Sequence, residues 1–487
     1  MEKEYDFIII GAGLSGVNAA YRLKTLLPEC SYTILEAREE IGGTWSFFKF
    51  PGVRSDSELT LLGLPWRPWK HEMDMADAAL ILDYIQDAAR DEGIDKKIQF
   101  SHRVTGANWS SEEQHWTLSV LAGDVKKEYS AKFLLACTGY YDYAKPLQAE
   151  IPGIENFRGT VAHPQFWPKD LYYADKKVII IGSGATAATM VPAMAKTASQ
   201  VTMLQRSPSY VMSLPRSNRV NVWLKKHLPE RIAHSINWWL SLFFENLFIY
   251  FSITFPNQMR KILTKEMKAQ FPDNVDVDVH FNPKYNPWDQ RVNMCPDGEF
   301  FKAFHRGNCD VVTDRIKTVT EDGILTESGK KLEADIIVTA TGLHLHLFGG
   351  IIPTVDGESV DIGTRYCWRG AMLSGLPNAG TVTGYTTTSW TIGADACVKL
   401  LFKVWKHMKK VGATSVVPVH AQDDLHSSKP VVAHSSTYFV MAQSRFPRVT
   451  GESPWYGRKN VYYDWFKLWF GSMTKGLEYT VPSKKNE

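Results

Sequence analysis

Two glycine-rich loops are the residues whose types and spacing most directly indicate chemistry. They read Gly11-Ala12-Gly13-Leu14-Ser15-Gly16 and Gly182-Ser183-Gly184-Ala185-Thr186-Ala187. Each loop follows an apolar, strand-like run and precedes a helix-like segment, which is the context in which such a loop binds a dinucleotide. Glycine lets a pyrophosphate approach the backbone at the positive end of the helix dipole. The pair of loops predicts two dinucleotide sites, with tight turns that bind no nucleotide as the alternative.

The residue that follows the second strand of each unit distinguishes the two cofactors. In the first unit it is Glu36, whose carboxylate can accept both ribose hydroxyls of an adenosine and would repel a 2′-phosphate. The corresponding stretch of the second unit, Gln205-Arg206-Ser207, has no acidic residue, and its guanidinium and hydroxyl groups suit a 2′-phosphate. We therefore predict FAD or NAD at the first loop and NADP at the second. A plain surface cation is the alternative for Arg206.

Two dinucleotides in one chain indicate a hydride relay in which NADPH reduces a flavin. Disulfide reductases of this layout need a redox-active Cys pair, usually closely spaced. The six Cys include no Cys-x-x-Cys motif and lie far apart, at Cys30, Cys137, Cys295, Cys309, Cys367 and Cys397. The other common electron acceptor is O₂, so an oxygen-using flavoenzyme is favoured.

Two longer patterns narrow this choice. Residues 157–168 fit FxGxxxHxxxWP, and residues 42–56 fit GGxWxxxxFPGxxxD, at every fixed position. They resemble the fingerprints of type I Baeyer–Villiger monooxygenases, within the wider flavin-containing monooxygenases, and the resemblance runs nearly end to end. It implies FAD and NADPH as cofactors, a C4a-peroxyflavin formed with O₂, and insertion of one oxygen atom into a ketone to give an ester or lactone. Sulfoxidation is implied as a side activity.

The resemblance also implies roles for individual residues. Arg291 matches the arginine that stabilises the peroxide anion, and Asp56 matches the carboxylate that positions this arginine. The alternatives are a surface ion pair for Arg291 and a helix N-cap for Asp56. No metal ligand is predicted. The predicted cofactor-binding residues are Gly11, Gly13, Ser15, Gly16, Glu36, Gly43, Thr44, Trp45, Ser46, Phe47, Arg54, Ser55, Asp56, Val104, Gly182, Ser183, Gly184, Ala185, Thr186, Ala187, Arg206 and Ser207.

Two other functions remain open at this point. One is a flavin monooxygenase that mainly oxygenates sulfur or nitrogen. The other is an NADPH-reduced flavoprotein that transfers electrons to a partner, although Arg291 and Asp56 speak against it. The expected partners are O₂ and an apolar ketone or thioether.

The elements that must position these residues form a nested arrangement. Apolar strands at 133–136 and 335–338 each end in a small-residue turn, and each is expected to close one dinucleotide domain. The predicted fold class is α/β, with two Rossmann-like dinucleotide-binding domains, for FAD and NADP, the second inserted in the first, and with a helical insertion. The predicted segments are 1–145 and 343–487 for the FAD domain, 146–215 and 281–342 for the NADP domain, and 216–280 for the helical insertion.

Composition limits the partners and the location. A net charge of +3 is too small to indicate a nucleic-acid partner. No export signal precedes the first strand-like run, so a cytoplasmic location is expected. The apolar stretch 238–255 carries Glu245 and Asn246 at its centre, and a central carboxylate costs about 3 kcal/mol on membrane insertion. A buried helix of the insertion and peripheral membrane contact are the two interpretations of this stretch. The oligomeric state is not indicated.

Overall fold

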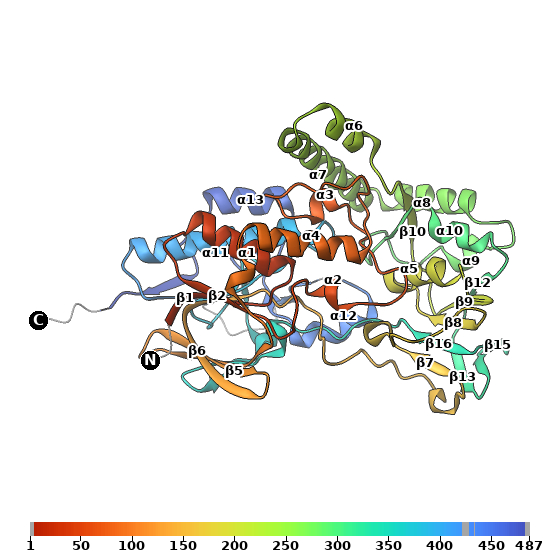
Figure 1. Cartoon of the computed structure of the whole chain (residues 1–487), viewed down its shortest axis with the longest axis horizontal. Coiled ribbons are helices and arrows are strands. Elements are labelled where there is room, and N and C mark those ends of the chain that lie inside the picture. The colour runs from red at the N-terminus through yellow and green to blue at the C-terminus, as the bar shows by residue number, and fades with distance from the viewer. Residues whose placement is uncertain (1–3, 421–427, 433, 483–487) are drawn as a thin grey trace, which may run out of the picture.

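The computed structural model describes residues 4–420, 428–432 and 434–482 and shows two α/β units that lie next to each other (Figure 1). The first unit contains the N-terminal and C-terminal parts of the described chain. The second unit is built from the middle of the sequence. This nested arrangement confirms the predicted fold class.

A large mixed sheet organises the first unit, in the order β18-β17-β4-β5-β6-β1-β2-β3, with β21 also paired to β6. The second half of β6 is parallel to β1 and β21, whereas its first half forms an antiparallel meander with β5 and β4. Successive side chains of β1 point into different cores, Phe7 to one face and Ile8 to the other. The strands are β1 Glu4–Ile10, β2 Tyr32–Leu35, β3 Ile98–Gln99, β4 His102–Ser110, β5 His115–Ala122, β6 Val125–Ala136, β17 Pro353–Val355, β18 Glu358–Ser359 and β21 Ala379–Thr381.

An all-parallel sheet in the order β12-β9-β8-β16-β7 organises the second unit. Its strands are β7 Thr160–Ala162, β8 Lys177–Ile181, β9 Gln200–Gln205, β12 Cys309–Thr313 and β16 Ile336–Thr339. The helix α1 (Leu14–Leu26) connects β1 to β2, and α5 (Ala185–Met194) connects β8 to β9. Both predicted βαβ units are therefore confirmed.

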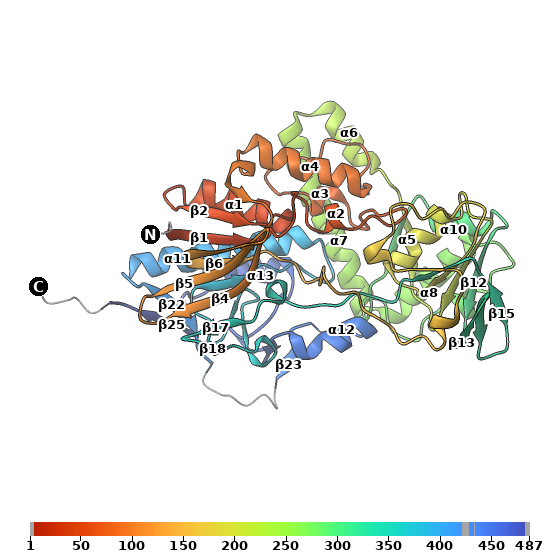
Figure 2. The ribbon, with the colours of Figure 1, turned by 60° about the horizontal axis from the view of Figure 1, so that its bottom comes forward.

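The chain crosses between the units along two extended segments, residues 137–159 after β6 and residues 340–352 after β16 (Figure 2). The two crossings lie side by side, because Tyr141 and Leu345 form an isolated antiparallel bridge. The predicted boundaries at residues 145 and 342 fall inside these crossings.

The predicted helical insertion consists of α6 (Arg219–His227), α7 (Glu230–Thr254), α8 (Pro256–Gln270) and α9 (Val277–His280). The buried face of α7 combines apolar residues such as Leu242 with polar ones: Asn237 donates to Thr60 Oγ1 at 2.8 Å, and Ser241 donates to Glu58 Oε2 at 3.2 Å. Many of its apolar side chains are exposed, so the interpretation as a buried helix holds for one face of α7 only. These exposed residues are Ile232, Ile236, Trp239, Leu240, Phe243, Phe244, Leu247, Tyr250 and Ile253.

Among the described residues, no single helix is both long and apolar enough to cross a bilayer. Together, α7 and α8 are long and apolar enough to cross a bilayer, but the chain bends by 110° between them. The Trp238 ring of α7 stacks on Trp465 of α13 (Val461–Phe470), with ring centroids 5.8 Å apart.

The remaining elements pack around the two sheets. Further helices are α2 Thr44–Phe47, α3 Leu59–Leu62, α4 Ala78–Asp91, α10 Glu299–Phe304, α11 Trp390–Lys410 and α12 Thr437–Ala442. In the described chain, four two-stranded sheets pair β10 Val211–Leu214 with β11 Asn293–Pro296, β19 Cys367–Trp368 with β20 Met372–Leu373, β22 Ser415–Pro418 with β25 Leu477–Thr480, and β23 Lys429–Pro430 with β24 Arg448–Val449. A three-stranded sheet contains β13 Ile316–Thr320, β14 Gly323–Thr326 and β15 Lys331–Glu333.

Candidate active site

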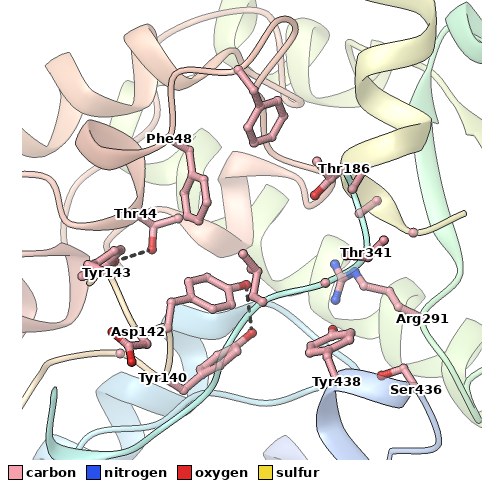
Figure 3. A pocket seen from close by; sticks show the side chains of 18 of the residues that line it. Thr44, Phe48, Tyr140, Asp142, Tyr143, Thr186, Arg291, Thr341, Ser436 and Tyr438 are labelled. Atoms are coloured by element: carbon pink, nitrogen blue, oxygen red, sulfur yellow. Dashed lines mark hydrogen bonds between the residues drawn. The ribbon is translucent and has the colours of Figure 1, made fainter. Parts of the chain in front are cut away.

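A cavity of about 1280 Å³ lies where the two units meet. Both glycine loops line it, with Gly11 and Gly13 from the first unit and Gly182 and Gly184 from the second. Arg291 lies in the part of the cavity shown in Figure 3. The structure thus brings both predicted dinucleotide loops and the predicted catalytic arginine to one connected space.

The first loop is the tight turn between β1 and α1. The N–H of Gly11 donates to the carbonyl of Leu35 at 2.8 Å, and its φ of 102° lies in the region that favours glycine. Glu36, directly after β2, accepts the N–H of Ala12 on Oε2 at 2.6 Å and that of Arg38 on Oε1 at 3.0 Å. Burial raises the pKa of Glu36, although these hydrogen bonds and the Arg38 charge oppose the shift. An ionised carboxylate has further lone pairs, so Glu36 can also accept ribose hydroxyls.

The second loop repeats this turn between β8 and α5. The N–H of Gly182 donates to the carbonyl of Leu204 at 2.8 Å, with a φ of 138°. Gln205, which occupies the position equivalent to Glu36, turns away from the loop and donates to the carbonyl of His280 at 2.6 Å. Arg206 is exposed, lines the cavity and donates to Thr437 Oγ1 at 3.1 Å. The second unit therefore has no acid at this position and carries a cation one residue further along the chain.

Asp56 of the first unit and Arg291 of the second form a bidentate ion pair. Arg291 Nε donates to Asp56 Oδ2 at 2.7 Å, and Nη2 donates to Oδ1 at 2.8 Å. Burial alone would raise the pKa of Asp56, but the charge and hydrogen bonds of Arg291, together with the charge of Arg54, outweigh it and lower this pKa, while Asp56 raises the pKa of Arg291. Both side chains stay charged and fixed in direction. The N-cap alternative for Asp56 does not hold, because the N-cap of α3 is Glu58.

Other predicted residues line the cavity with their polar atoms already engaged. Arg54 donates through Nε to Glu299 Oε1 at 3.0 Å and through Nη2 to the Met294 carbonyl at 3.2 Å. Ser55 Oγ donates to the carbonyl of Ser57 at 2.7 Å. Cofactor contacts of these residues stay a prediction. Ser15, Gly43, Thr44, Trp45, Val104, Ser183, Ala185, Thr186 and Ser207 also line the cavity.

Four predicted cofactor-binding residues do not line the cavity. Gly16 packs against the backbone of Gly11, and Ala187, its counterpart in the second loop, lies in the core of its unit. The Ser46 hydroxyl accepts from Arg38 at 2.7 Å and donates to the Gly43 carbonyl at 3.1 Å. Phe47 packs its ring on Tyr143, with centroids 4.5 Å apart. These residues pack behind the loops, and their contact with a cofactor stays a prediction.

The cavity has an aromatic wall that the sequence did not predict. Tyr140 and Tyr141 come from the first crossing, and Tyr438 comes from α12 near the end of the chain (Figure 3). Tyr140 and Tyr438 lie close enough to Arg291 to interact electrostatically with its guanidinium group. Burial raises the pKa of both phenols, so both are neutral donors at pH 7. Tyr438 follows no motif, so no sequence signal could have found it.

Glu245 is another residue that sequence analysis left without a role in the site. Its Oε2 accepts the Thr388 hydroxyl at 2.8 Å, and Thr388 lines the cavity. Burial raises the pKa of Glu245 to about 7. The carboxyl that interrupts the apolar stretch 238–255 therefore faces the interior of the protein.

The residues present fit the two predicted cofactors. The N-caps of α1 and α5 are Gly13 and Gly184, and neither cap is occupied by a side chain of the described residues, so first-turn N–H groups are available to a pyrophosphate. A Cβ added at Gly184 would meet nothing within 4 Å in the described chain, so the loop is an open cradle. Glu36 suits ribose hydroxyls and Arg206 suits a 2′-phosphate.

Comparisons with known proteins agree with this geometry. Residues 69–349 match the model of the flavin-binding monooxygenase-like family, and residues 9–77 match an NAD(P)-binding Rossmann-like domain. The FAD-containing monooxygenase EthA of Mycolicibacterium smegmatis is 43% identical over 95% of this chain and 94% of its own. A probable FAD-binding monooxygenase, AlmA of Acinetobacter baylyi, is 38% identical over 93% of this chain and 92% of its own.

Solved structures share the fold over the whole chain. A steroid monooxygenase bound to NADP superposes with a TM-score of 0.75 at 19% identity, covering 99% of this chain and 100% of that one. OTEMO in complex with FAD and NADP gives a TM-score of 0.74 at 20% identity, covering 98% and 99%. The chain therefore belongs to the flavin-binding monooxygenase-like family, which confirms the prediction of a monooxygenase that depends on FAD and NADPH.

Proposed function

We propose that this enzyme is a Baeyer–Villiger monooxygenase that converts apolar ketones into esters or lactones. The observation that carries this proposal is the Asp56–Arg291 pair, which holds a cation in the cavity that both glycine loops line. The fold is shared with cyclohexanone monooxygenase, whose structures with cyclohexanone and ε-caprolactone contain a ketone and a lactone.

The reaction consumes NADPH, a proton and O₂. One oxygen atom enters the bond between the carbonyl carbon and its neighbour, and the other leaves as water. FAD, when bound, supplies hydride storage and the activation of O₂. Arg291 supplies a fixed positive charge that stabilises negative charge developing on oxygen. Asp56 sets the orientation of this guanidinium before substrate arrives, and the tyrosine wall limits the access of water.

The assignment of the two loops is part of this proposal. The first loop and Glu36 would hold FAD, and the second loop and Arg206 would hold NADPH. The predicted boundaries would then give an FAD domain of residues 1–145 and 343–487, and an NADP domain of residues 146–215 and 281–342. The helical insertion of residues 216–280 would contribute Glu245 to the wall between them.

The decisive variant is Arg291→Ala. We expect NADPH to reduce the flavin at an unchanged rate, while ester formation from aliphatic ketones falls about 10²–10³-fold, as on removal of other transition-state charge donors. Flavin absorbance under anaerobic conditions measures the first step, and mass spectrometry of the products measures the second. Arg158→Ala, on an exposed pair with Glu321, is the matched control and should change neither. Ester formation that persists in Arg291→Ala would contradict the role of Arg291.

The substrate class needs its own measurement. Wild-type enzyme is given a ketone and a thioether of equal length in separate reactions with NADPH and O₂. Ester formation establishes the ketone reaction. Sulfoxide without ester would move the assignment to a sulfur monooxygenase. NADPH oxidation that yields neither product, with all oxygen recovered as peroxide, would favour the electron-transfer class.

We also propose that the exposed faces of α7 and α13 contact an anionic lipid surface. Phe244 of α7 is 61% exposed, and Trp469 and Phe470 of α13 are 69% and 77% exposed. Lys226, exposed in the last turn of the neighbouring α6, would meet lipid phosphates, while the aromatic rings enter the interface. This placement would give apolar substrates a route from the lipid.

Vesicle sedimentation tests the lipid contact. Holoenzyme should pellet with phosphatidylglycerol-containing vesicles and not with pure phosphatidylcholine vesicles, and Trp469→Ser with Phe470→Ser should reduce the pelleted fraction. Equal pelleting of this variant, or none with either vesicle, would contradict the proposal. Light scattering of the protein without lipid distinguishes lipid binding from self-association, because a dimer formed through this face would also exist without lipid.

A further inference from the structure

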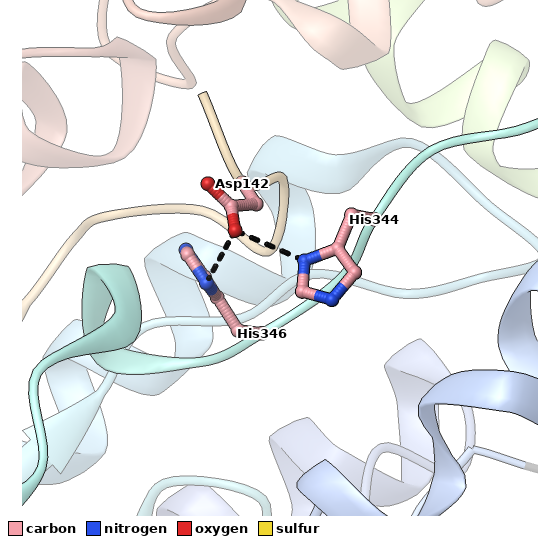
Figure 4. A group of neighbouring side chains, drawn as sticks. All are labelled: Asp142, His344 and His346. Carbon is pink, nitrogen blue, oxygen red and sulfur yellow. Dashed lines mark hydrogen bonds and ion pairs between the residues drawn. The ribbon is translucent and has the colours of Figure 1, made fainter. Parts of the chain in front are cut away.

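The two crossings place three metal-ligating side chains together (Figure 4). Residues 344–346 run in extended conformation around the Tyr141–Leu345 bridge, so His344 and His346 point to the same side while Leu345 is buried. Asp142 lies opposite them, because its N–H donates to the carbonyl of His344 at 2.9 Å. A His-x-His pair on one strand thus faces a carboxylate on its neighbour.

The carboxylate of Asp142 is held in one orientation. Its Oδ1 accepts the backbone N–H groups of Ala144 at 2.9 Å and Lys145 at 3.1 Å. Its Oδ2 points at the two imidazoles, 3.0 Å from Nδ1 of His344 and 3.5 Å from Nδ1 of His346. The backbone bonds fix one oxygen, so the other is positioned in advance as a ligand.

The spacing of these atoms matches a metal coordination shell. Ligands bound to Zn²⁺ at about 2.0–2.2 Å in tetrahedral geometry lie about 3.4 Å from one another. The two distances from Asp142 Oδ2 bracket this value, and the three ligand atoms all lie within 4.8 Å of one another. Rotation of one imidazole would close the remaining separation.

The donor set selects the class of ion. Two imidazole nitrogens and one carboxylate oxygen suit Zn²⁺ and neighbouring transition metals, whereas Mg²⁺ and Ca²⁺ prefer oxygen ligands alone. The side chains of Asp142, His344 and His346 are 10%, 26% and 17% exposed, so an ion can enter without unfolding the site. Asp142 and His346 also line the main cavity, which leaves room for water as a fourth ligand.

We propose that Asp142, His344 and His346 form a binding site for a divalent transition-metal ion of the Zn²⁺ class. The site lies outside the Asp56–Arg291 pair and does not depend on the proposed ketone reaction. The ion would join the first crossing to the second, because its ligands come from both. Binding would therefore restrain the segments through which the two units are connected. Without the ion, the same residues form a hydrogen-bonded clip centred on Asp142.

Equilibrium dialysis of the holoenzyme against Zn²⁺ tests this site. The protein is prepared without a polyhistidine tag, stripped with a chelator, and dialysed at micromolar free Zn²⁺, and bound zinc is measured by mass spectrometry. We expect one ion per chain in the wild type. Loss of an outer partner alone weakens metal sites about 10–100-fold, so His344→Gln and His346→Gln should each weaken binding at least about tenfold. The flavin absorbance of each variant reports its folding.

The control is His227→Gln, at the C-terminal end of α6, which should bind zinc like the wild type. Binding that is equal in all variants would place the ion elsewhere and overturn the proposal, as would the absence of stoichiometric binding in the wild type. If a histidine variant loses its flavin, anomalous scattering from zinc-soaked crystals of the wild type is measured in place of the dialysis of that variant. A peak between the three side chains supports the site, and a peak elsewhere or none overturns it.

Discussion

The two glycine loops share one backbone design and differ in the residues around it. In each, the N–H of the first glycine donates to a carbonyl near the end of the second strand, that of Leu35 in one loop and of Leu204 in the other, and both bonds are 2.8 Å long. The place of the third glycine in the Gly-x-Gly-x-x-Gly motif is occupied by Gly16 in one loop and by Ala187 in the other. A Cβ at Gly16 would overlap the carbonyl oxygen of Gly11, whereas Ala187 has room for its methyl group in the core. The same fold therefore tolerates different packing behind the two turns.

The strand ends differ more than the turns. Glu36 turns back and accepts the Ala12 N–H, so the first loop is closed by its own carboxylate. Gln205 turns away to His280, and the next residue, Arg206, reaches the cavity instead. The first unit thus presents an acid at the strand end, and the second unit presents a cation one residue later. From this comparison we predict that the residue at the strand end decides cofactor preference and that the turn binds the pyrophosphate.

The largest expected effect comes from Gly16→Ala, which tests the packing difference. The added methyl group must displace the backbone of Gly11, and overpacking of this kind costs about 1–3 kcal/mol. We expect the purified variant to lose most of its FAD and to unfold at a lower temperature. The ratio of flavin to protein absorbance measures the first effect. Retention of a full complement of FAD would show that the first turn is as tolerant as the second.

The next effect is expected from Arg206→Ala. Hydrogen bonds to charged groups contribute about 1.5–3 kcal/mol, so the KM for NADPH should rise about 10–100-fold. The KM for NADH should change little, because NADH has no 2′-phosphate. Steady-state kinetics with both nucleotides measures the ratio, and Arg206→Lys should give an intermediate value. Equal rises for both nucleotides would remove the proposed difference between the two strand ends.

A smaller, pH-dependent effect is expected from Glu36→Gln. Because burial raises the pKa of Glu36, ionising this residue in the folded apoprotein costs stability. Wild-type stability relative to the variant is therefore highest below about pH 4.3, the ordinary value for Glu, and falls as pH rises through the raised pKa. Urea unfolding of both apoproteins between acidic and neutral pH measures this difference. A constant difference would mean that the Ala12 and Arg38 hydrogen bonds fully offset the burial of Glu36.

The smallest effect is expected from Ala187→Gly, which makes the second loop resemble the first. Glycine in a helix costs about 0.5–1 kcal/mol relative to alanine, so the melting temperature should fall by a few degrees at most. The KM for NADPH should stay unchanged, because Ala187 does not line the cavity. A large rise in KM would show that this position contacts the nucleotide after all.

Local patterns made the two βαβ units predictable. Alternation of apolar strand, glycine turn and helix occupies about thirty consecutive residues in each unit, so its physical causes are near neighbours in sequence. Glu36 and Arg206 were found for the same reason, since each closely follows a strand end. For the motif positions Gly16, Ser46, Phe47 and Ala187, contact with a cofactor stays a prediction, because a fixed residue in a motif can be required for packing rather than for contact.

The sequence by itself determined the strands, the glycine turns and the charge at each strand end, because these depend on local backbone propensity and short spacing. Tertiary structure alone decided which distant side chains meet. Asp56 and Arg291 are 235 positions apart, and Asp142 is 202 positions from His344. Likewise, Glu245 in the apolar stretch faces the interior and accepts the Thr388 hydroxyl only because α7 packs on the first unit. Such contacts depend on how whole elements pack, and no local period in the sequence records that packing.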